Sequence, residues 1–272
     1  MEIFIQSEIG GRSENQDTYG LRQTRYGKLI VVCDGMGGHR GGARASKLAV
    51  ITILEEMKKA SIKHDAVSVL RSAIEKANTR IWDESRSNSA YQNMGTTIVA
   101  LLISSQKAIC CHIGDSRLYQ LRAGKIIHRT LDHSHVFELV KAGMMTEEEA
   151  RVSNQSNIIT RALGISPIVE IEMDNLSYQQ GDRFLLCTDG IWGALPEMEL
   201  IKLASRSGNI EQINKELVEK IDAIGFKNGG KHDNLTAALV DIDQDFEKNN
   251  KIKFDKKNKS IFRIAVKPFR KK

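Results

Sequence analysis

An apolar run that stops abruptly at an acid and a group of glycines constrains this chain more than any other stretch. Leu29–Cys33 consists of aliphatic residues and a cysteine, Asp34 follows it, and the next positions read Gly35-Met36-Gly37-Gly38-His39. Such a run is typical of a buried strand, so Asp34 is expected at a strand end on the rim of the core. The glycines allow backbone groups to approach a ligand closely. Asp-Gly alone is also an ordinary turn, so the interpretation depends on whether the pattern recurs.

The pattern recurs at three further acids. The apolar runs 108–114 and 184–188 end at Asp115 and Asp189, and Asp233 opens the run 235–240. If these strand ends converge, the carboxylates repel one another unless a cation lies between them. Carboxylates without a Cys- or His-rich ligand set indicate a hard ion such as Mg²⁺ or Mn²⁺. Several acids in one place suit two ions, which can activate a bridging water for phosphoester hydrolysis.

The composition is that of an ordinary globular protein. The 272 residues allow one large domain or two small ones, and 41% are hydrophobic and 27% charged. No apolar segment approaches the roughly 18 residues of a membrane span. The N-terminus reads as a strand and lacks the pattern of a signal peptide. The four cysteines lie inside apolar runs and are interpreted as core residues. The sequence therefore predicts a cytoplasmic protein.

The positive charge of the chain is concentrated at its C-terminal end. Residues 248–272 contain eleven Lys and Arg against one acid, Asp255, so this segment carries +10 and residues 1–247 carry −4 of the net charge of +6. A mildly acidic body argues against a nucleic-acid-binding fold. The segment is interpreted either as a solvated extension or as a tail that docks on an acidic partner or an anionic membrane surface.

The order of short strands and paired helices favours two packed sheets covered by helices. Apolar periodicity predicts strands at 2–9, 18–24, 28–34, 97–103, 107–113, 117–122, 168–173, 184–188 and 234–241. It predicts helices at 40–59, 63–84, 196–206 and 209–224, with two short helices within 135–151.

Eight short motifs then resemble one family, the metal-dependent serine/threonine protein phosphatases of type 2C in their bacterial form. The motifs occur in the family's order over about residues 3–241. They are Arg12-x-x-Asn15-Gln16-Asp17, Val32-Cys33-Asp34-Gly35-Met36-Gly37-Gly38-His39, Met94-Gly95-Thr96-Thr97, Gly114-Asp115-Ser116-Arg117, Asp132-His133-Ser134, Arg161-Ala162-Leu163-Gly164, Cys187-Thr188-Asp189-Gly190 and Asp233-Asn234.

The resemblance implies an α+β fold, a four-layer α-β-β-α sandwich of two central antiparallel sheets flanked by helix pairs. Residues 1–243 would form the catalytic domain and residues 244–272 a flexible basic extension. By similarity, Asp34 would bridge two Mn²⁺ or Mg²⁺ ions, Gly35 would offer its carbonyl, and Asp189 and Asp233 would complete the second ion. Asp115 with Asp189 would match a third, weaker metal site. Asp17 would hold metal-bound water from outside the ligand set, and Arg12 would grip the substrate phosphate.

The chemistry of two of these residues agrees with the implied roles. The planar guanidinium of Arg12 can bind two phosphate oxygens at once, although an isolated arginine is more often a surface residue. His39 follows Asp34 in the same Gly-rich loop, and its protonated ring could supply the proton that a serine or threonine alkoxide needs to leave. His112, His128, His133 and His135 are interpreted as structural, with the alternative that His133 orients part of the cleft.

The implied reaction is hydrolysis of phosphoserine and phosphothreonine on proteins by a monomeric enzyme, opposing a serine/threonine kinase. The alternative is a catalytically inactive, phosphoprotein-binding scaffold, against which the complete set of implied metal ligands argues. A dinucleotide-binding loop is excluded because Arg40 stands where the pattern after Gly35-x-Gly37 requires glycine. The chain departs from the family at Ser153-Asn154-Gln155-Ser156, where His-Pro and a basic residue are usual, in a region that resembles a mobile flap.

Overall fold

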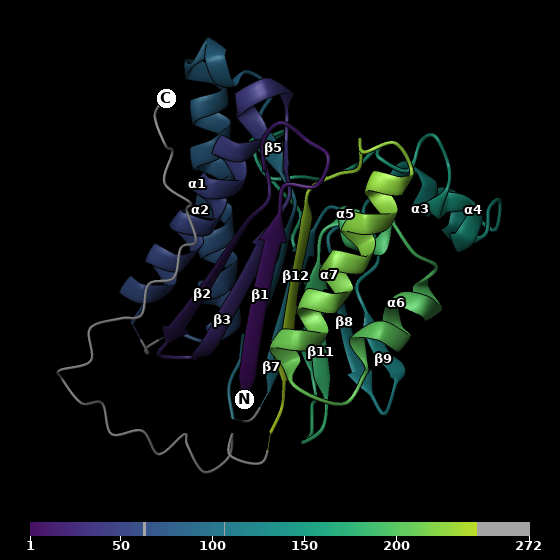
Figure 1. The fold of residues 1–272 in the computed structure, drawn as a ribbon. Coiled ribbons are helices and arrows are strands. Elements are labelled where there is room, and N and C mark those ends of the chain that lie inside the picture. The colour runs from purple at the N-terminus through teal and green to yellow at the C-terminus, as the bar shows by residue number, and fades with distance from the viewer. Residues whose placement is uncertain (62–63, 106, 244–272) are drawn as a thin grey trace, which may run out of the picture.

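The computed structural model describes residues 1–61, 64–105 and 107–243, except for the side chains of residues 38–40. Two five-stranded antiparallel sheets pack face to face at its centre (Figure 1). Sheet A has the order β1 (Glu2–Glu8), β12 (Leu235–Asp241), β11 (Arg183–Cys187), β8 (Arg117–Arg122), β9 (Lys125–Arg129). Sheet B has the order β10 (Glu172–Leu176), β7 (Ala108–Ile113), β6 (Ile98–Ile103), β3 (Gly27–Cys33), β2 (Thr18–Thr24).

Helices cover the outer face of each sheet, which confirms the predicted four-layer α-β-β-α sandwich. One apolar cluster joins sheet B to α1 (Gly38–Lys59) and α2 (Ala66–Ser87). A second joins sheet A to α5 (Asp189–Trp192), α6 (Glu197–Ala204) and α7 (Ile210–Lys227). A third fills the space between the sheets. The remaining elements are η1 (Ser89–Tyr91), the pair β4 (Gly35–Met36) and β5 (Gly95–Thr96), α3 (His135–Lys141) and α4 (Glu147–Arg151).

Strand β3 shows why the central strands read as continuous apolar runs. Leu29, Val31 and Cys33 point into the cluster under α1 and α2. Ile30 and Val32 point into the cluster between the sheets, and all five side chains are fully buried. A strand covered on both faces has no polar alternation, which is the pattern that marks the sequence before Asp34.

Most predicted elements are confirmed within a few residues, and one strand was placed wrongly. The strand expected at 168–173 is β10, which begins only at Glu172, where it pairs with His112 of β7. Ile168 is 84% exposed, so its apolar character reflects a surface position. The short edge strand β9 was not predicted, because its charged and aliphatic residues carry a weak strand signal.

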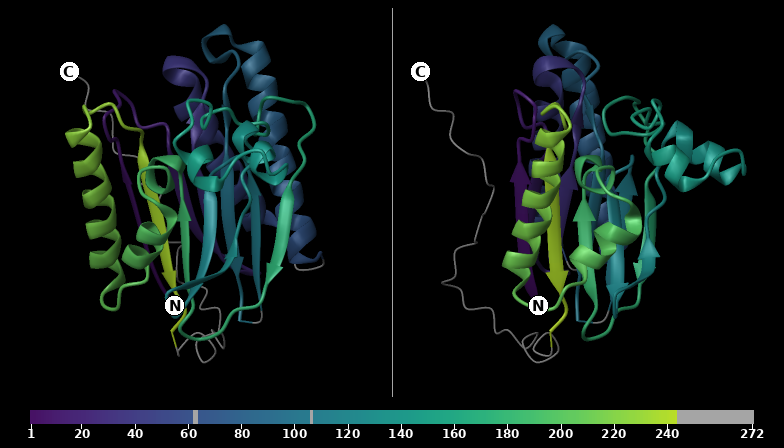
Figure 2. Two further views of the ribbon diagram at one scale, coloured as in Figure 1. Left: turned by 90° about the vertical axis from the view of Figure 1, so that its right-hand side faces the viewer. Right: turned by 45° about the vertical axis from the view of Figure 1, so that its right-hand side comes forward.

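Helices α3 and α4 project from the sandwich as a separate unit, which we call the flap (residues 135–157; Figure 2). Two arginines connect it to the body: Arg129 of β9 donates two hydrogen bonds to Glu147, and Arg151 donates one to the Gly193 carbonyl. None of the helices in the described part of the chain has the length and apolar character that crossing a membrane requires.

Candidate metal centre

The four strand-end acids meet at one end of the sandwich because of the strand directions. Strands β3 and β7 both pair antiparallel with β6, so they run the same way and deliver Asp34 and Asp115 to the same edge. In sheet A, β11 and β12 are antiparallel, so the end of β11 lies beside the start of β12. Asp189, which follows β11, is therefore close to Asp233, which precedes β12. In Figure 1 this is the end from which β12 starts, opposite the N-terminus.

These acids line a single cavity of about 360 Å³. Of the predicted site residues, the cavity wall contains Arg12, Asp34, Gly35, Asp115, Asp189 and Asp233. Asp17 lies behind this wall, and His39 is in the first turn of α1, with its side chain outside the described part of the structure. The wall is completed by Ser13, Glu14, Gln16, Met36, Gly37, Thr97, Asn157, Ile159 and Asn234.

The backbone around Asp34 is held by neighbouring hydroxyl and amide groups. Its N–H donates to Thr97 Oγ1 at 3.0 Å, and its carbonyl accepts from the Thr97 N–H at 2.8 Å and from Thr96 Oγ1 at 2.7 Å. The Gly35 N–H donates to the Gln16 carbonyl at 3.2 Å. A Cβ on Gly35 would lie 2.1 Å from the Gly42 carbonyl oxygen, so only glycine fits between these backbones.

Asp17 is fixed by two threonines close to the motif acids of sheet A: Thr188 directly precedes Asp189, and Thr236 is three residues after Asp233. Its Oδ2 accepts from Thr188 Oγ1 at 2.9 Å and from Thr236 Oγ1 at 2.7 Å. Its Oδ1 is buried without a hydrogen-bond partner, as is Asp189 Oδ1. A buried carboxylate oxygen is normally satisfied, so these two oxygens are free to accept a proton, a water or a cation.

Arg12 is carried by a loop that Asn234 secures. Asn234 accepts from the Gln16 N–H at 2.8 Å and donates to the carbonyls of Ile9 at 2.8 Å and Glu14 at 3.0 Å. Arg12 Nη2 donates to Asp233 Oδ2 at 2.7 Å, while half of the Arg12 side chain is exposed. The guanidinium therefore faces the cavity with donors to spare.

The electrostatics of the site disfavour four negative charges without a counter-ion. Burial, together with repulsion from the neighbouring acids, raises the pKa of Asp17 to about 7 and that of Asp189 to about 6. Burial raises the pKa of Asp34 and of Asp115 well above the ordinary range, again with repulsion from their neighbours. A cation among these groups stabilises their ionised forms.

Several residues that build the site were not identified as functional from the sequence. Thr97, Thr188 and Asn234 belong to the quoted motifs, but no role followed from their type alone. Thr236 is one polar residue in an apolar strand, and that isolated hydroxyl is the signal that could have revealed it. The atypical segment 153–156 of the flap lies just before Asn157, which lines the cavity.

Comparison with known proteins identifies the family. The model of the protein phosphatase 2C family matches residues 6–221. Protein phosphatase PhpP of Streptococcus pneumoniae is 34% identical over 251 residues, covering 90% of this chain and 99% of the relative. Serine/threonine phosphatase stp of Listeria monocytogenes is 31% identical over 236 residues, covering 85% of this chain and 92% of the relative.

Solved structures give the same result. Serine/threonine phosphatase Stp1 from Staphylococcus aureus matches with a TM-score of 0.79 and 30% identity, covering 89% of this chain and 95% of the other. The catalytic domain of the serine threonine protein phosphatase PstP, in complex with 2 manganese ions, matches with a TM-score of 0.73 and 29% identity, covering 89% of this chain and 98% of the other. This chain belongs to the protein phosphatase 2C family, which confirms the resemblance drawn from its motifs and the predicted enzyme class.

Proposed function

We propose that the cavity is the active site at which this phosphatase hydrolyses phosphoserine and phosphothreonine in proteins, with divalent cations held among its acids. The observation that carries the proposal is the convergence of Asp34, Asp115, Asp189 and Asp233 from four strand ends on one cavity. The alternative of an inactive, phosphoprotein-binding scaffold has no supporting observation, since the relatives are named phosphatases and these acids are present together.

The donor set fits hard cations. It consists of carboxylate and carbonyl oxygens, which suit Mn²⁺ and Mg²⁺. Asp34 would contact both ions, the Gly35 carbonyl would add a ligand, and Asp189 and Asp233 would complete the second ion. Asp115 would serve a third, weaker site together with Asp189. When bound, the ions would supply the positive charge that lowers the pKa of a bound water and makes it a nucleophile at neutral pH.

The chain's own residues orient the substrate and the acids. Arg12 is exposed beside Asp233, and its remaining N–H groups can bind two oxygens of a phosphoryl group. Asp17, anchored by Thr188 and Thr236, keeps one free oxygen that can accept a hydrogen bond from a metal-bound water. Both roles follow from hydrogen-bonding capacity.

His39 is proposed as the general acid that protonates the leaving serine or threonine oxygen. The support is its position in the first turn of α1, shortly after Asp34 and Gly35. An alkoxide is a poor leaving group, so proton transfer from an imidazolium would lower the barrier.

The oligomeric state, the cellular location and role, and the identity of the metal ion stay predictions. They are a monomeric, cytoplasmic protein that opposes a serine/threonine kinase in signalling, and Mn²⁺ or Mg²⁺ as the ion used. Residues 244–272 lie outside the described residues, so the expected flexibility of this basic segment and its docking on an acidic partner or membrane surface stay predictions too.

The test is phosphate release from a phosphothreonine peptide, with and without Mn²⁺, for the wild type and Asp189→Asn. The substitution keeps the shape of the side chain and removes its charge, so we expect turnover to be lost while the circular-dichroism spectrum is unchanged. Metal-independent release, or undiminished release by Asp189→Asn, would contradict the proposed metal site.

A further inference from the structure

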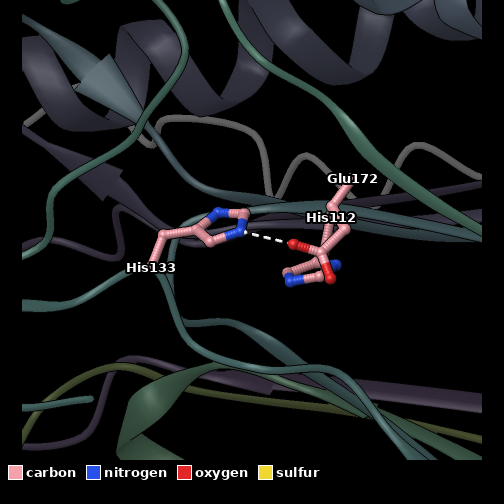
Figure 3. Close-up of side chains that lie close together, drawn as sticks. All are labelled: His112, His133 and Glu172. Atoms are coloured by element: carbon pink, nitrogen blue, oxygen red, sulfur yellow. Dashed lines mark hydrogen bonds and ion pairs between the residues drawn. The ribbon is translucent and has the colours of Figure 1, made fainter. Parts of the chain in front are cut away.

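A buried polar cluster beside the flap has no part in the reaction proposed above. His112 of β7, His133 just before α3 and Glu172 of β10 lie together (Figure 3), and both histidines are almost fully buried. The centroids of the two imidazole rings are 4.7 Å apart with 16° between the ring planes. The dashed line in Figure 3 is the contact of His133 Nε2 with Glu172 Oε2 at 3.0 Å.

Two histidines and a glutamate suit a transition metal, but the position of the ring proton of His133 argues against one. The Gly114 N–H donates to His133 Nδ1 at 3.2 Å, so this nitrogen carries a lone pair. The single proton of the neutral ring therefore sits on Nε2, where it is donated to Glu172. A metal on Nε2 would require the ring to lose that proton or the Gly114 hydrogen bond to break. Burial lowers the pKa of His133, which favours this neutral form.

Two further side chains surround the ring of His133. His112 Nε2 lies 2.9 Å from the Leu131 carbonyl, to which it can donate its proton. Arg161 Nη1 lies 3.4 Å from His133 Nε2, but both groups carry N–H donors in this tautomer, so this contact is not a hydrogen bond. Arg161 Nη2 pairs instead with Glu170 at 3.1 Å. The ring of His133 is thus oriented from one side and presents Nδ1 to the backbone on the other.

We propose that His133 is a positioning residue that holds the turn carrying Asp115. It makes two hydrogen bonds to Gly114, one from its own N–H to the Gly114 carbonyl at 2.9 Å and one to the Gly114 N–H through Nδ1. Gly114 has a φ of 100°, and a Cβ there would lie 2.7 Å from Thr97 Cγ2, so the turn is tightly confined. On its other side, Trp192 Nε1 donates to the Asp115 carbonyl at 2.9 Å.

The same residue connects this turn to the segment that returns from the flap. The Thr160 N–H donates to the His133 carbonyl at 2.8 Å, and Ser134 forms a β-bridge with Ile159. Ile159 lines the cavity, as Asp115 does. His133 therefore connects two walls of the cavity. Of its hydrogen bonds to these two walls, only the one through Nδ1 is made by its side chain, whose Nε2 contacts Glu172 instead.

The inference rests on the proposed role of Asp115 as a ligand of the weaker metal site. Outer groups that orient metal ligands typically change metal affinity about tenfold or more when removed. Removing the His133 ring should therefore weaken binding at the site that contains Asp115, whereas a side chain with an acceptor at the Nδ1 position should restore it. Asn places its amide oxygen near that position, and Gln places its polar atoms nearer to Nε2.

The experiment compares full-length wild type with His133→Ala, His133→Asn and His133→Gln. Amide hydrogen exchange at Gly114, followed by NMR in the metal-free protein, reports the hydrogen bond directly. Calorimetric Mn²⁺ titration reports the weaker site. For His133→Ala we expect Gly114 exchange to accelerate about tenfold or more, as for loss of one buried hydrogen bond. We expect the Mn²⁺ affinity of the weaker site to fall about tenfold. His133→Asn should recover most of both losses, and His133→Gln should not.

Two controls separate this inference from the proposed function. His135→Ala removes an exposed histidine two positions away and should change neither readout. Asp115→Asn should abolish the weaker Mn²⁺ site; if it does not, the role of Asp115 fails, while Gly114 exchange still decides the role of His133. Unchanged Gly114 exchange in His133→Ala would overturn the inference. Should His133→Ala fail to fold, equal behaviour of the Asn and Gln variants would overturn it.

Discussion

Asn234→Ala should weaken both the fold and the use of substrate, because one side chain secures the loop that carries Arg12. Asn234 is almost fully buried and makes three hydrogen bonds to the backbone of Ile9, Glu14 and Gln16. At about 1 kcal/mol for each bond, the free energy of unfolding should fall by about 3 kcal/mol. That is a large share of the roughly 5–15 kcal/mol typical of a folded domain, but it leaves the variant folded at 25 °C.

Asn78→Ala is a matched control for this loss of stability. Asn78 of α2 is as deeply buried and also makes three backbone hydrogen bonds, to Gly164, Ser166 and Pro167, none of which lines the cavity. We expect a similar fall in the free energy of unfolding, measured by urea denaturation in chelator. At saturating Mn²⁺, kcat/KM for a phosphothreonine peptide should fall on the order of tenfold for Asn234→Ala, because Arg12 is displaced, and change little for Asn78→Ala.

The comparison can refute the reasoning in two ways. Equal losses of kcat/KM in both variants would mean that reduced stability alone explains the effect. A loss of stability in Asn234→Ala with unchanged kcat/KM would mean that the loop does not position Arg12. The backbone N–H of Asn234, which donates to Asp233 Oδ1 at 2.8 Å, remains in the variant, so loss of that bond is not an alternative explanation.

Two further predictions concern protons. The pKa of Asp17 is raised to about 7, so the folded, metal-free protein keeps a proton that the unfolded chain releases near pH 4. The contribution of this proton to the free energy of unfolding is therefore present at low pH and is lost as the pH rises to about 7. The free energy of unfolding of Asp17→Asn minus that of the wild type, measured in chelator, should therefore increase between pH about 5 and 7, and a decrease would contradict the assigned direction. His39→Ala should reduce turnover of a phosphothreonine peptide more than that of an aryl phosphate, whose leaving group needs less protonation; equal losses in a steady-state comparison would argue against the acid role.

The architecture was predictable because its central strands are covered on both faces. Runs such as Leu29–Cys33 and Phe184–Cys187 contain no polar residues, so the ends of these strands are clear in the sequence. The acids that follow them could therefore be placed at strand ends from the sequence alone. The bounds of the edge strands could not be read from the sequence in this way. Strand β9 exposes both a charged residue, Lys125, and an aliphatic residue, Ile127, so its sequence has no apolar run. Strand β10 begins where its backbone meets β7 rather than where the apolar residues begin.

The acids of the cavity could be recognised from the sequence, whereas the residues that anchor them could not. Asp34 and Asp189 are marked by local pattern, an apolar run followed by Asp-Gly, whereas the partners of Asp17 are 171 and 219 residues away in the chain. No spacing rule relates such positions, because their contact exists only once β11 and β12 pair beside the N-terminal segment. His133 shows the limit most clearly: its residue type suggests a ligand or a core residue, and only the Gly114 N–H at its Nδ1 assigns the tautomer. This contact is the basis for proposing that His133 positions the turn that carries Asp115. The sequence pattern could not assign that role, and the exchange rate of the Gly114 amide hydrogen tests it.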